Sequence, residues 1–221
     1  MRNINAMGLA LLAMLATSAV AATAASADDK LTAESYPVTL TGGVDPGSNV
    51  QWVLGMNVNC SQVQDHGSLS STATTFSVSA VFSGCLGAGL QTTIHMNGCT
   101  FLYHLVAGDT THGTVDIVCP AGQEITFTIN PAEHGLTNKC TIHVKPQTGL
   151  GEVTFTNVGV GATRELTFHL NLKKIHYVKT EGTGLGRCTS GTGTDGTLTT
   201  TTVLTGENAS GTHIALYMSK V

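Results

Sequence analysis

The segment 97–120, NGCTFLYHLVAGDTTHGTVDIVCP, has a cysteine near each end and two histidines between them. When Cys99 is set opposite Cys119 in an antiparallel hairpin, the register also aligns the apolar residues on the face of the cysteines: Phe101 with Ile117, Tyr103 with Val115, and Leu105 with Gly113. Directly opposed residues have Cα separations that a disulfide can span. The segment therefore predicts a disulfide-closed hairpin, a link that contributes about 3 kcal/mol by the chain-entropy estimate.

The two histidines of this segment have different settings. His104 falls on the polar face of the first strand, opposite the face of the cysteines, whereas His112 lies at the end of the turn 107–112. A shared metal would require both imidazoles to point toward one place. We therefore interpret the segment as structural rather than as a metal or redox site.

Alternation of apolar and polar residues with period two continues through most of the chain, which is typical of strands with one buried face. Clear examples are QWVLGMNVNC (51–60), QEITFTIN (123–130), RELTFHLNL (164–172) and THIALYM (212–218). Clusters rich in glycine, proline and asparagine separate about a dozen such strands, a spacing typical of a sandwich or of a sheet that closes on itself. We expect an all-β, two-sheet antiparallel sandwich, immunoglobulin-like or jelly-roll-like.

The first 27 residues have the pattern of a secretory signal peptide. Arg2 precedes an apolar run, and Ala25-Ser26-Ala27 matches an A-x-A cleavage site. No later stretch reaches the roughly 20 apolar residues of a membrane helix, so no membrane span is expected after cleavage. Residues 28–221 are expected to form a single β-sandwich domain, with two small β-domains dividing near 107–112 as the alternative.

All six cysteines lie beyond residue 27, and an even count in an exported chain predicts three disulfides. Structural zinc sites need C-x₂₋₄-C pairs, and the sequence contains none. Cys60 and Cys85 each end the apolar face of a strand, so they are expected to pair with each other. The complete prediction is Cys60–Cys85, Cys99–Cys119 and Cys140–Cys188.

Composition narrows the classes of partner. Only 11% of residues are charged, the formal net charge is −4, and basic residues gather no further than Lys173-Lys174. Nucleic-acid partners require a basic face, so none is expected. The expected partner is an extracellular ligand or a component of the cell envelope, and nothing in the sequence specifies an oligomeric state.

Motifs for catalysis and metal binding are weak. The chain has no G-x-S-x-G elbow and no S-x-x-K. The neighbouring acid–base pairs Asp65-His66 and Glu133-His134 are expected to lie in loops and to point apart. His95, His143 and His169 recur in a T-[IF]-H context on the polar faces of strands, and they would form a surface metal site only if those strands were adjacent. We predict no catalytic, cofactor-binding or metal-ligating residue, and leave metal binding by the surface histidines as the alternative.

Several landmarks occur in an order that resembles an uncharacterised family of secreted, cysteine-containing, β-rich actinobacterial proteins. They are AESYPVTLTG (33–42), NCSQVQ (59–64), SVSAVFSGC (77–85), TIHMNGCTFLYHL (93–105), VDIVCPAGQEI (115–125), CTIHV (140–144) and GTGTDGTLTTTTVLTG (191–206). The resemblance covers most of the chain after residue 27 and includes the pattern NGC-x-[FY]-x-[FY]. It implies secretion and the fold, and it implies no activity.

The sequence favours a non-catalytic protein that is secreted or associated with the cell envelope and has a structural or binding role. Its strongest motifs serve the fold, and its strands are rich in threonine and serine. The alternative is a secreted hydrolase or carbohydrate-binding module with a loop-built site. Aromatic residues make up only 5% of the chain and mostly fall on apolar faces, which argues against an aromatic platform for sugars.

Overall fold

A computed structural model describes residues 29–130, 139–180 and 188–220, and these ranges contain fifteen strands and one short 3₁₀ turn, η2 (Gly161–Thr163). The strands are β1 (Asp29–Ala33), β2 (Val38–Val44), β3 (Val50–Val53), β4 (Asn57–Leu69), β5 (Thr75–Gly87), β6 (Leu90–His95), β7 (Thr100–Val106), β8 (Asp109–Val118), β9 (Ile125–Ile129), β10 (Cys140–Val144), β11 (Gln147–Val158), β12 (Glu165–Thr180), β13 (Gly191–Glu207), β14 (His213–Ile214) and β15 (Leu216–Lys220). The signal-peptide prediction for residues 1–27 and the pair Glu133-His134 lie outside the described ranges.

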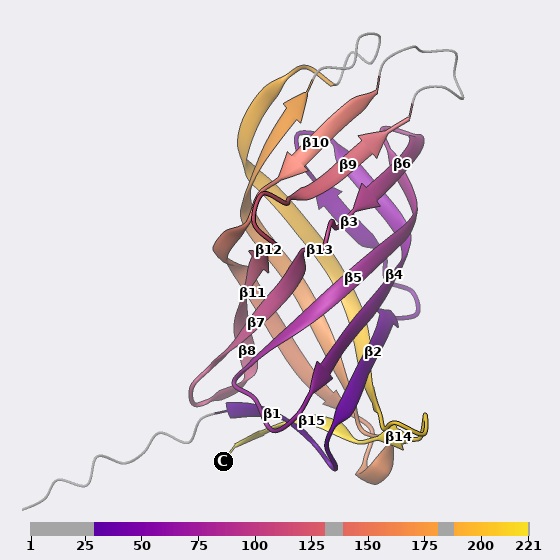
Figure 1. The fold of residues 1–221 in the computed structure, drawn as a ribbon, viewed down its shortest axis with the longest axis vertical. Coiled ribbons are helices and arrows are strands. Elements are labelled where there is room, and N and C mark those ends of the chain that lie inside the picture. The colour runs from indigo at the N-terminus through magenta and orange to yellow at the C-terminus, as the bar shows by residue number, and fades with distance from the viewer. Residues whose placement is uncertain (1–28, 131–138, 181–187, 221) are drawn as a thin grey trace, which may run out of the picture.

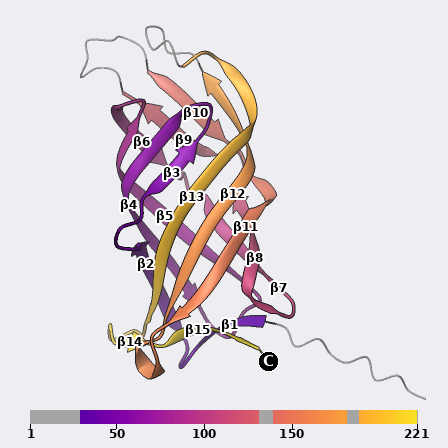
Figure 2. The same cartoon turned by 180° about the vertical axis from the view of Figure 1, so that it is seen from behind.

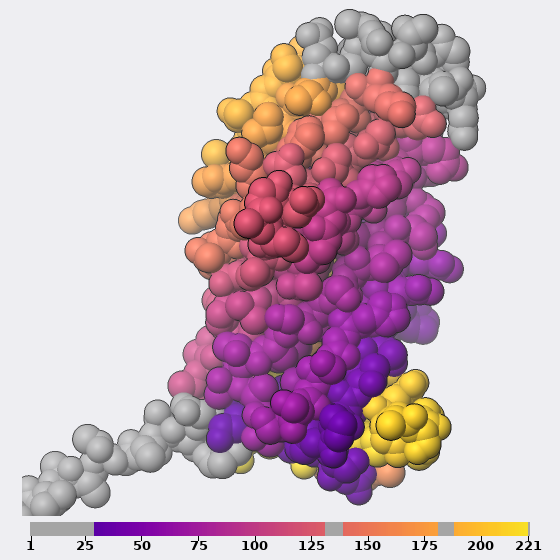
Figure 3. All heavy atoms as spheres, in the orientation of Figure 1, coloured from indigo at the N-terminus to yellow at the C-terminus, as the bar shows by residue number. Residues whose placement is uncertain are grey.

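Thirteen of the strands form one antiparallel sheet, and this sheet closes on itself. The closure comes from β4 and β5, which pair along most of their length, from Val58 opposite Gly87 to Gly67 opposite Val78. The result is an elongated cylinder (Figures 1 and 3). The second sheet contains only β1 and β15.

The cylinder has two tiers that share the four long strands β4, β5, β12 and β13. In the lower tier of Figure 1 these strands pair with β2, β7, β8 and β11, which gives a closed ring of eight strands. In the upper tier they pair with β3, β6, β9 and β10, which gives a second ring of eight. Figure 2 shows β12 and β13 running through both tiers on the opposite side.

The expected fold class is confirmed in its main features, since the described residues form antiparallel β-structure in two sheets with three disulfides. The large sheet is continuous around the core. β4 pairs with β5 on one side of the cylinder, and β12 pairs with β13 on the other. The two-stranded sheet covers one end of this cylinder rather than forming a second wall (Figure 1).

The predicted hairpin register is confirmed residue by residue. β7 pairs with β8 so that Phe101 lies opposite Ile117 and Tyr103 opposite Val115, with these four side chains buried. Residues 107 and 108 form the tip between the two strands. The alternation that set the register therefore reflects a face that packs into the interior of the cylinder.

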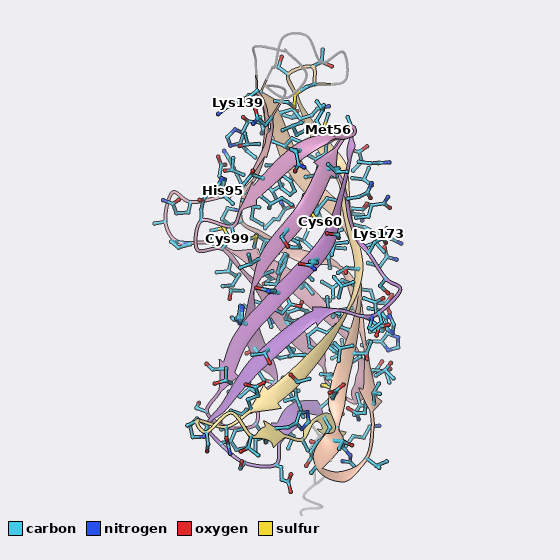
Figure 4. All side chains as sticks on the ribbon, turned by 90° about the vertical axis from the view of Figure 1, so that its right-hand side faces the viewer. Met56, Cys60, His95, Cys99, Lys139 and Lys173 are labelled. Carbon is cyan, nitrogen blue, oxygen red and sulfur yellow. A yellow bond between two sulfur atoms is a disulfide. The ribbon has the colours of Figure 1, made fainter. Side chains whose placement is uncertain are left out.

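The three predicted disulfides are confirmed, and each ties a different part of the cylinder. Cys60–Cys85 joins directly opposed residues of β4 and β5. Cys99–Cys119 joins the two places where the chain passes between tiers, from β6 to β7 and from β8 to β9. Cys140–Cys188 links the first residue of β10 to the segment that follows β12. Figure 4 shows Cys60 and Cys99 near the middle of the cylinder, and Met56 and Lys139 at its upper end.

Aromatic side chains fill the interior in two clusters. One surrounds Trp52, which is fully buried and lies 5.1 Å from Phe127 and 5.8 Å from Phe82, measured between ring centroids. The other contains Phe76, Tyr103, Phe155 and Phe168, with neighbouring centroids 4.9 to 5.2 Å apart along the chain of contacts. At these separations aromatic pairs add to the stabilisation that burial alone provides.

Side-chain amides complete the sheet where the strands change partners. β12 pairs with β11 up to Asn171 and with β10 from Val178 onward, so the two tiers meet between these residues. There the Gln147 side chain takes the place of a strand residue: its Nε2 donates to the His176 carbonyl at 3.0 Å, and its Oε1 accepts from the His176 amide at 2.8 Å. Two backbone groups of β12 are thereby satisfied at the junction.

Asn157 makes the same kind of contact at the lower end, where the β1–β15 sheet covers the cylinder. Its Nδ2 donates to the Met218 carbonyl at 3.1 Å, and its Oδ1 accepts from the Met218 amide at 2.8 Å. Leu31 and Leu216, one from each strand of this sheet, are fully buried beneath it. The Asn157 side chain therefore attaches the small sheet to β11.

Replacement of Asn157 by alanine is expected to loosen this attachment. Loss of two part-exposed hydrogen bonds should lower the free energy of unfolding by about 1–2 kcal/mol, measured by urea denaturation. Amide exchange should accelerate at Met218 while β12 stays protected. The control is Asn171→Ala, because the Asn171 side chain is exposed on β12. Equal effects of the two substitutions on Met218 exchange would contradict the role given to Asn157.

Candidate functional site

Asp65 is the one carboxylate among the described residues of the large sheet that points into the cylinder. It lies on β4, is 8% exposed, and faces the interior beside Tyr103, Thr200 and Thr202. Its neighbour His66 is exposed on the outer face, so the adjacent acid and base point apart, as expected. The interior therefore contains a small polar region between its two aromatic clusters.

The backbone opposite Asp65 is shaped to admit the carboxyl group. Gly42 of β2 is paired with Asp65, and a Cβ at this glycine would lie 2.8 Å from the Val203 carbonyl and 3.1 Å from the Asp65 Cβ. Both approaches are closer than ordinary van der Waals contact. Glycine at position 42 thus leaves the space that Asp65 occupies.

Burial changes the acidity of two groups in this region. Burial raises the pKa of Asp65 from 3.8 to about 6, and a hydrogen bond from Thr202 opposes part of this rise. Burial also raises the pKa of Tyr103 well above its ordinary value, with the charge of Asp65 adding to the effect. Removal of a charged group from water disfavours its ionised form, which accounts for both directions.

The Asp65 carboxylate is expected to destabilise the folded protein at neutral pH. Its folded-state pKa of about 6 exceeds its ordinary value of 3.8, so the folded protein holds a proton that the unfolded chain releases between these values. The free energy of unfolding therefore falls as the pH rises from about 4 to 6, and ionisation costs about 3 kcal/mol above that range.

Asp65→Asn should remove this dependence. We expect the substitution to raise the free energy of unfolding at pH 7.5 by about 1–3 kcal/mol and to flatten its slope between pH 4 and 6, measured by urea titrations across that range. Asp45→Asn provides the control, because the Asp45 carboxyl is partly exposed outside the cylinder. A lower stability of Asp65→Asn at pH 7.5 would show that the charge is favourable where it lies.

Histidine–carboxylate pairs occur on the outer surface; His112–Asp109 lies within β8, and the others join neighbouring parts of the sheet. The pairs, with their N to O distances, are His104–Asp116 at 2.9 Å, His143–Glu124 at 2.6 Å, His112–Asp109 at 2.6 Å, His112–Glu152 at 3.4 Å and His213–Glu165 at 3.8 Å. All are at least partly exposed. Exposed ion pairs contribute about 0–1 kcal/mol each, so they have little influence on the fold.

One of these pairs also contacts a hydroxyl. Thr111 Oγ1 lies 2.6 Å from Asp109 Oδ1 and 2.8 Å from His112 Nδ1. Hydrogen bonds from the Thr111 side chain and backbone, followed by those from His112, lower the pKa of Asp109 to about 2. The hydroxyl is a donor to an ionised carboxylate here, which is the arrangement of a side-chain-stabilised turn.

The three histidines with a shared sequence context are only partly brought together. His95 and His143 both lie opposite Thr126, on the two strands that flank β9, whereas His169 lies opposite Thr154 and Thr201 elsewhere on the sheet. In residues 29–130, 139–180 and 188–220, no three His, Cys, Asp or Glu side chains are close enough to hold a metal ion.

A groove of about 650 Å³ crosses the outer face of β2, β12 and β13. Its lining residues are Thr41, Gly42, Gly43, Val44, Asp45, Pro46, Val158, Glu165, Thr167, Val203 and Thr205. Gly43 lies directly opposite Val203 and has no side chain, which lowers this part of the surface between the flanking threonines. We call this surface the threonine groove.

The threonine groove combines aliphatic surface with hydroxyls and two carboxylates. Thr41 Oγ1 and Thr205 Oγ1 lie 3.0 Å apart across neighbouring strands, and Asp45 and Glu165 contribute carboxylates to the lining. The lining contains no lysine, arginine or aromatic residue. Such a surface offers hydroxyl donors and acceptors to a ligand that brings hydroxyls of its own.

Sequence reasoning missed the groove, although it noted the richness in threonine and serine. The signal was present in TLTTTTVLTG (197–206), where the alternate residues Thr197, Thr199, Thr201 and Thr205 face outward. Pairing of β13 with β2 could not be read from this pattern. That pairing places Thr205 beside Thr41 and Val203 beside Gly43, and so creates the groove.

No protein-family model, curated protein or solved structure matches the chain. Within the described ranges, no helix has the length and apolar character needed to cross a membrane.

Proposed function

We propose that this is a non-catalytic protein, secreted or associated with the cell envelope, that binds a ligand through the threonine groove. The observation that carries the proposal is the groove itself: a hollow of about 650 Å³ lined mainly by hydroxyls, glycines and aliphatic groups. Most of its lining residues lie on paired strands, with only Asp45 and Pro46 in the turn after β2, so its shape is set mainly by the sheet.

The interior of the cylinder is a poorer candidate for ligand binding. Its side chains pack in two aromatic clusters, and the space beside Asp65 amounts to about 10 Å³. Small-molecule sites usually have volumes of about 300–1,000 Å³. The volume of the groove lies in this range, and the volume of the interior space is far below it.

The ligand best suited to the groove is an uncharged, hydroxyl-rich polymer, such as an extracellular or envelope polysaccharide. Neighbouring strands repeat about every 4.8 Å, which presents hydroxyls as an array rather than as a single point of contact. The carboxylates of Asp45 and Glu165 would repel an anionic polymer. We therefore favour a neutral ligand over an acidic one.

Three features support an exported location. The chain contains three disulfides and no free cysteine among its described residues, as expected for a protein that folds in an oxidising compartment. The signal-peptide pattern of residues 1–27 agrees with this location. The resemblance to secreted actinobacterial proteins points the same way.

A hydrolase with a loop-built site is the alternative function. The histidine–carboxylate pairs are the groups that would favour it, because an imidazole oriented by an acid is part of many hydrolytic sites. In the structure these pairs join neighbouring strands or turns, and the cysteines of the described residues are held in disulfides. The groove is therefore a more specific basis for a proposal than any of these pairs.

Gly43→Arg tests the proposal by filling the groove. A Cβ at Gly43 would lie 3.5 Å from its nearest neighbour, the Val63 carbonyl, so the sheet can accept a side chain there. We expect retention of the protein on neutral polysaccharides, measured on a glycan array and by pull-down with cell-envelope fractions, to fall at least tenfold.

Thr114→Arg is the matched control. It adds the same charge to an exposed position on β8, which lies on the opposite side of the lower ring from β2. Equal binding by wild type and Gly43→Arg would contradict the groove as the site. Turnover of a glycan or ester substrate by the wild-type protein would contradict the non-catalytic assignment.

A further inference from the structure

The hydroxyl of Thr200 is one of the buried polar groups that lack a hydrogen-bond partner within the protein, as the Trp52 indole nitrogen also does. Thr200 lies on β13, is 7% exposed, and points into the cylinder between the two aromatic clusters. Its Oγ1 is buried and has no hydrogen-bond partner among the atoms of the protein. A buried hydroxyl without a partner loses its hydration with no compensating hydrogen bond, so a ligand that hydrogen-bonds to it would be stabilising.

A small space adjoins this hydroxyl. Its volume is about 10 Å³, and its lining residues are Val63, Asp65, Ala80, Phe82, Phe101, Tyr103, Leu170, Leu198, Thr200 and Thr202. Three strands supply the polar members, since Asp65 comes from β4, Tyr103 from β7, and the threonines from β13. Polar groups that are distant in sequence therefore converge on one site inside an otherwise apolar core.

We propose that this site binds a single water molecule, which hydrogen-bonds to the Thr200 hydroxyl and to the Asp65 carboxyl group. Thr202 already donates to Asp65, which leaves other lone pairs of the carboxyl group for the water. The water provides the partner that Thr200 lacks within the protein. It also supplies part of the solvation that Asp65 loses on burial.

The volume and chemistry of the site select water over other ligands. A bound water requires roughly 10–15 Å³ of space and two to four polar partners, and this site meets both conditions. An organic ligand is far too large. A bound metal cation is less suitable, because hard cations take about six or more oxygen ligands and only four oxygen-bearing side chains line this space.

Water–protein cross-relaxation in NMR spectra of the wild-type protein tests the proposal directly. The Ala80 methyl group lines the site and carries no exchangeable proton. We expect a cross-peak between this methyl and water, with the opposite signs of NOE and ROE that mark cross-relaxation with protons held at the site for longer than the tumbling time of the protein. The cross-peak should be lost in Thr200→Val, which replaces the hydroxyl by a methyl of similar size.

Thr199→Val is the matched control, because the neighbouring Thr199 side chain faces outward on the same strand and the cross-peak should persist. Absence of the wild-type cross-peak would show that the site is dry and overturn the proposal. A dry site also predicts a higher melting temperature for Thr200→Val, because valine removes the unpaired hydroxyl. A bound cation would equally overturn the proposal. It would be identified if the wild-type melting temperature fell when choline replaced Na⁺ or K⁺ and that of Asp65→Asn did not.

Discussion

The pairing of β4 with β5 is the constraint on which the rest of the structure depends. It closes a thirteen-stranded sheet into a cylinder, so that the long strands have partners on both sides and few backbone groups are left at a free edge. Cys60–Cys85 crosses this pairing directly. Because each of the other strands spans only one tier, the long strands change partners at the middle of the cylinder, where Cys99–Cys119 and the Gln147 side chain hold the two tiers together.

Closure also decides where function can be located. The inward side chains pack against one another and leave beside Asp65 only about 10 Å³, enough for one water molecule. The outward side chains of β2, β12 and β13 leave a groove of about 650 Å³. The same sheet thus places a buried carboxylate, which costs stability at neutral pH, behind a wall whose outer face bears the proposed binding site.

Local pattern was enough to predict the all-β class, the hairpin register around Phe101 and Tyr103, and the disulfides Cys60–Cys85 and Cys99–Cys119, because each depends on a two-residue period or on nearby strands. Cys140–Cys188, 48 residues apart, followed mainly because those two cysteines remained. The closed sheet was not predicted, since the pairing of β13 with β2, 164 residues apart at Thr41 and Thr205, leaves no local signal. The threonine groove depends on that pairing. Asp65 and His66 were expected to point apart, but they lie on β4 rather than in the expected loop. The burial of Asp65 depends on Gly42 across the strand pair, which the sequence did not reveal.

Amide hydrogen exchange in β4 tests sheet closure most directly. Residues 64–67 pair with β2 on one side and with β5 on the other, so both alternating sets of amides should be protected. Slow exchange at all four positions is the predicted result. Rapid exchange at every second residue would show that β4 has a free edge, and an open two-layer sandwich would then replace the closed cylinder.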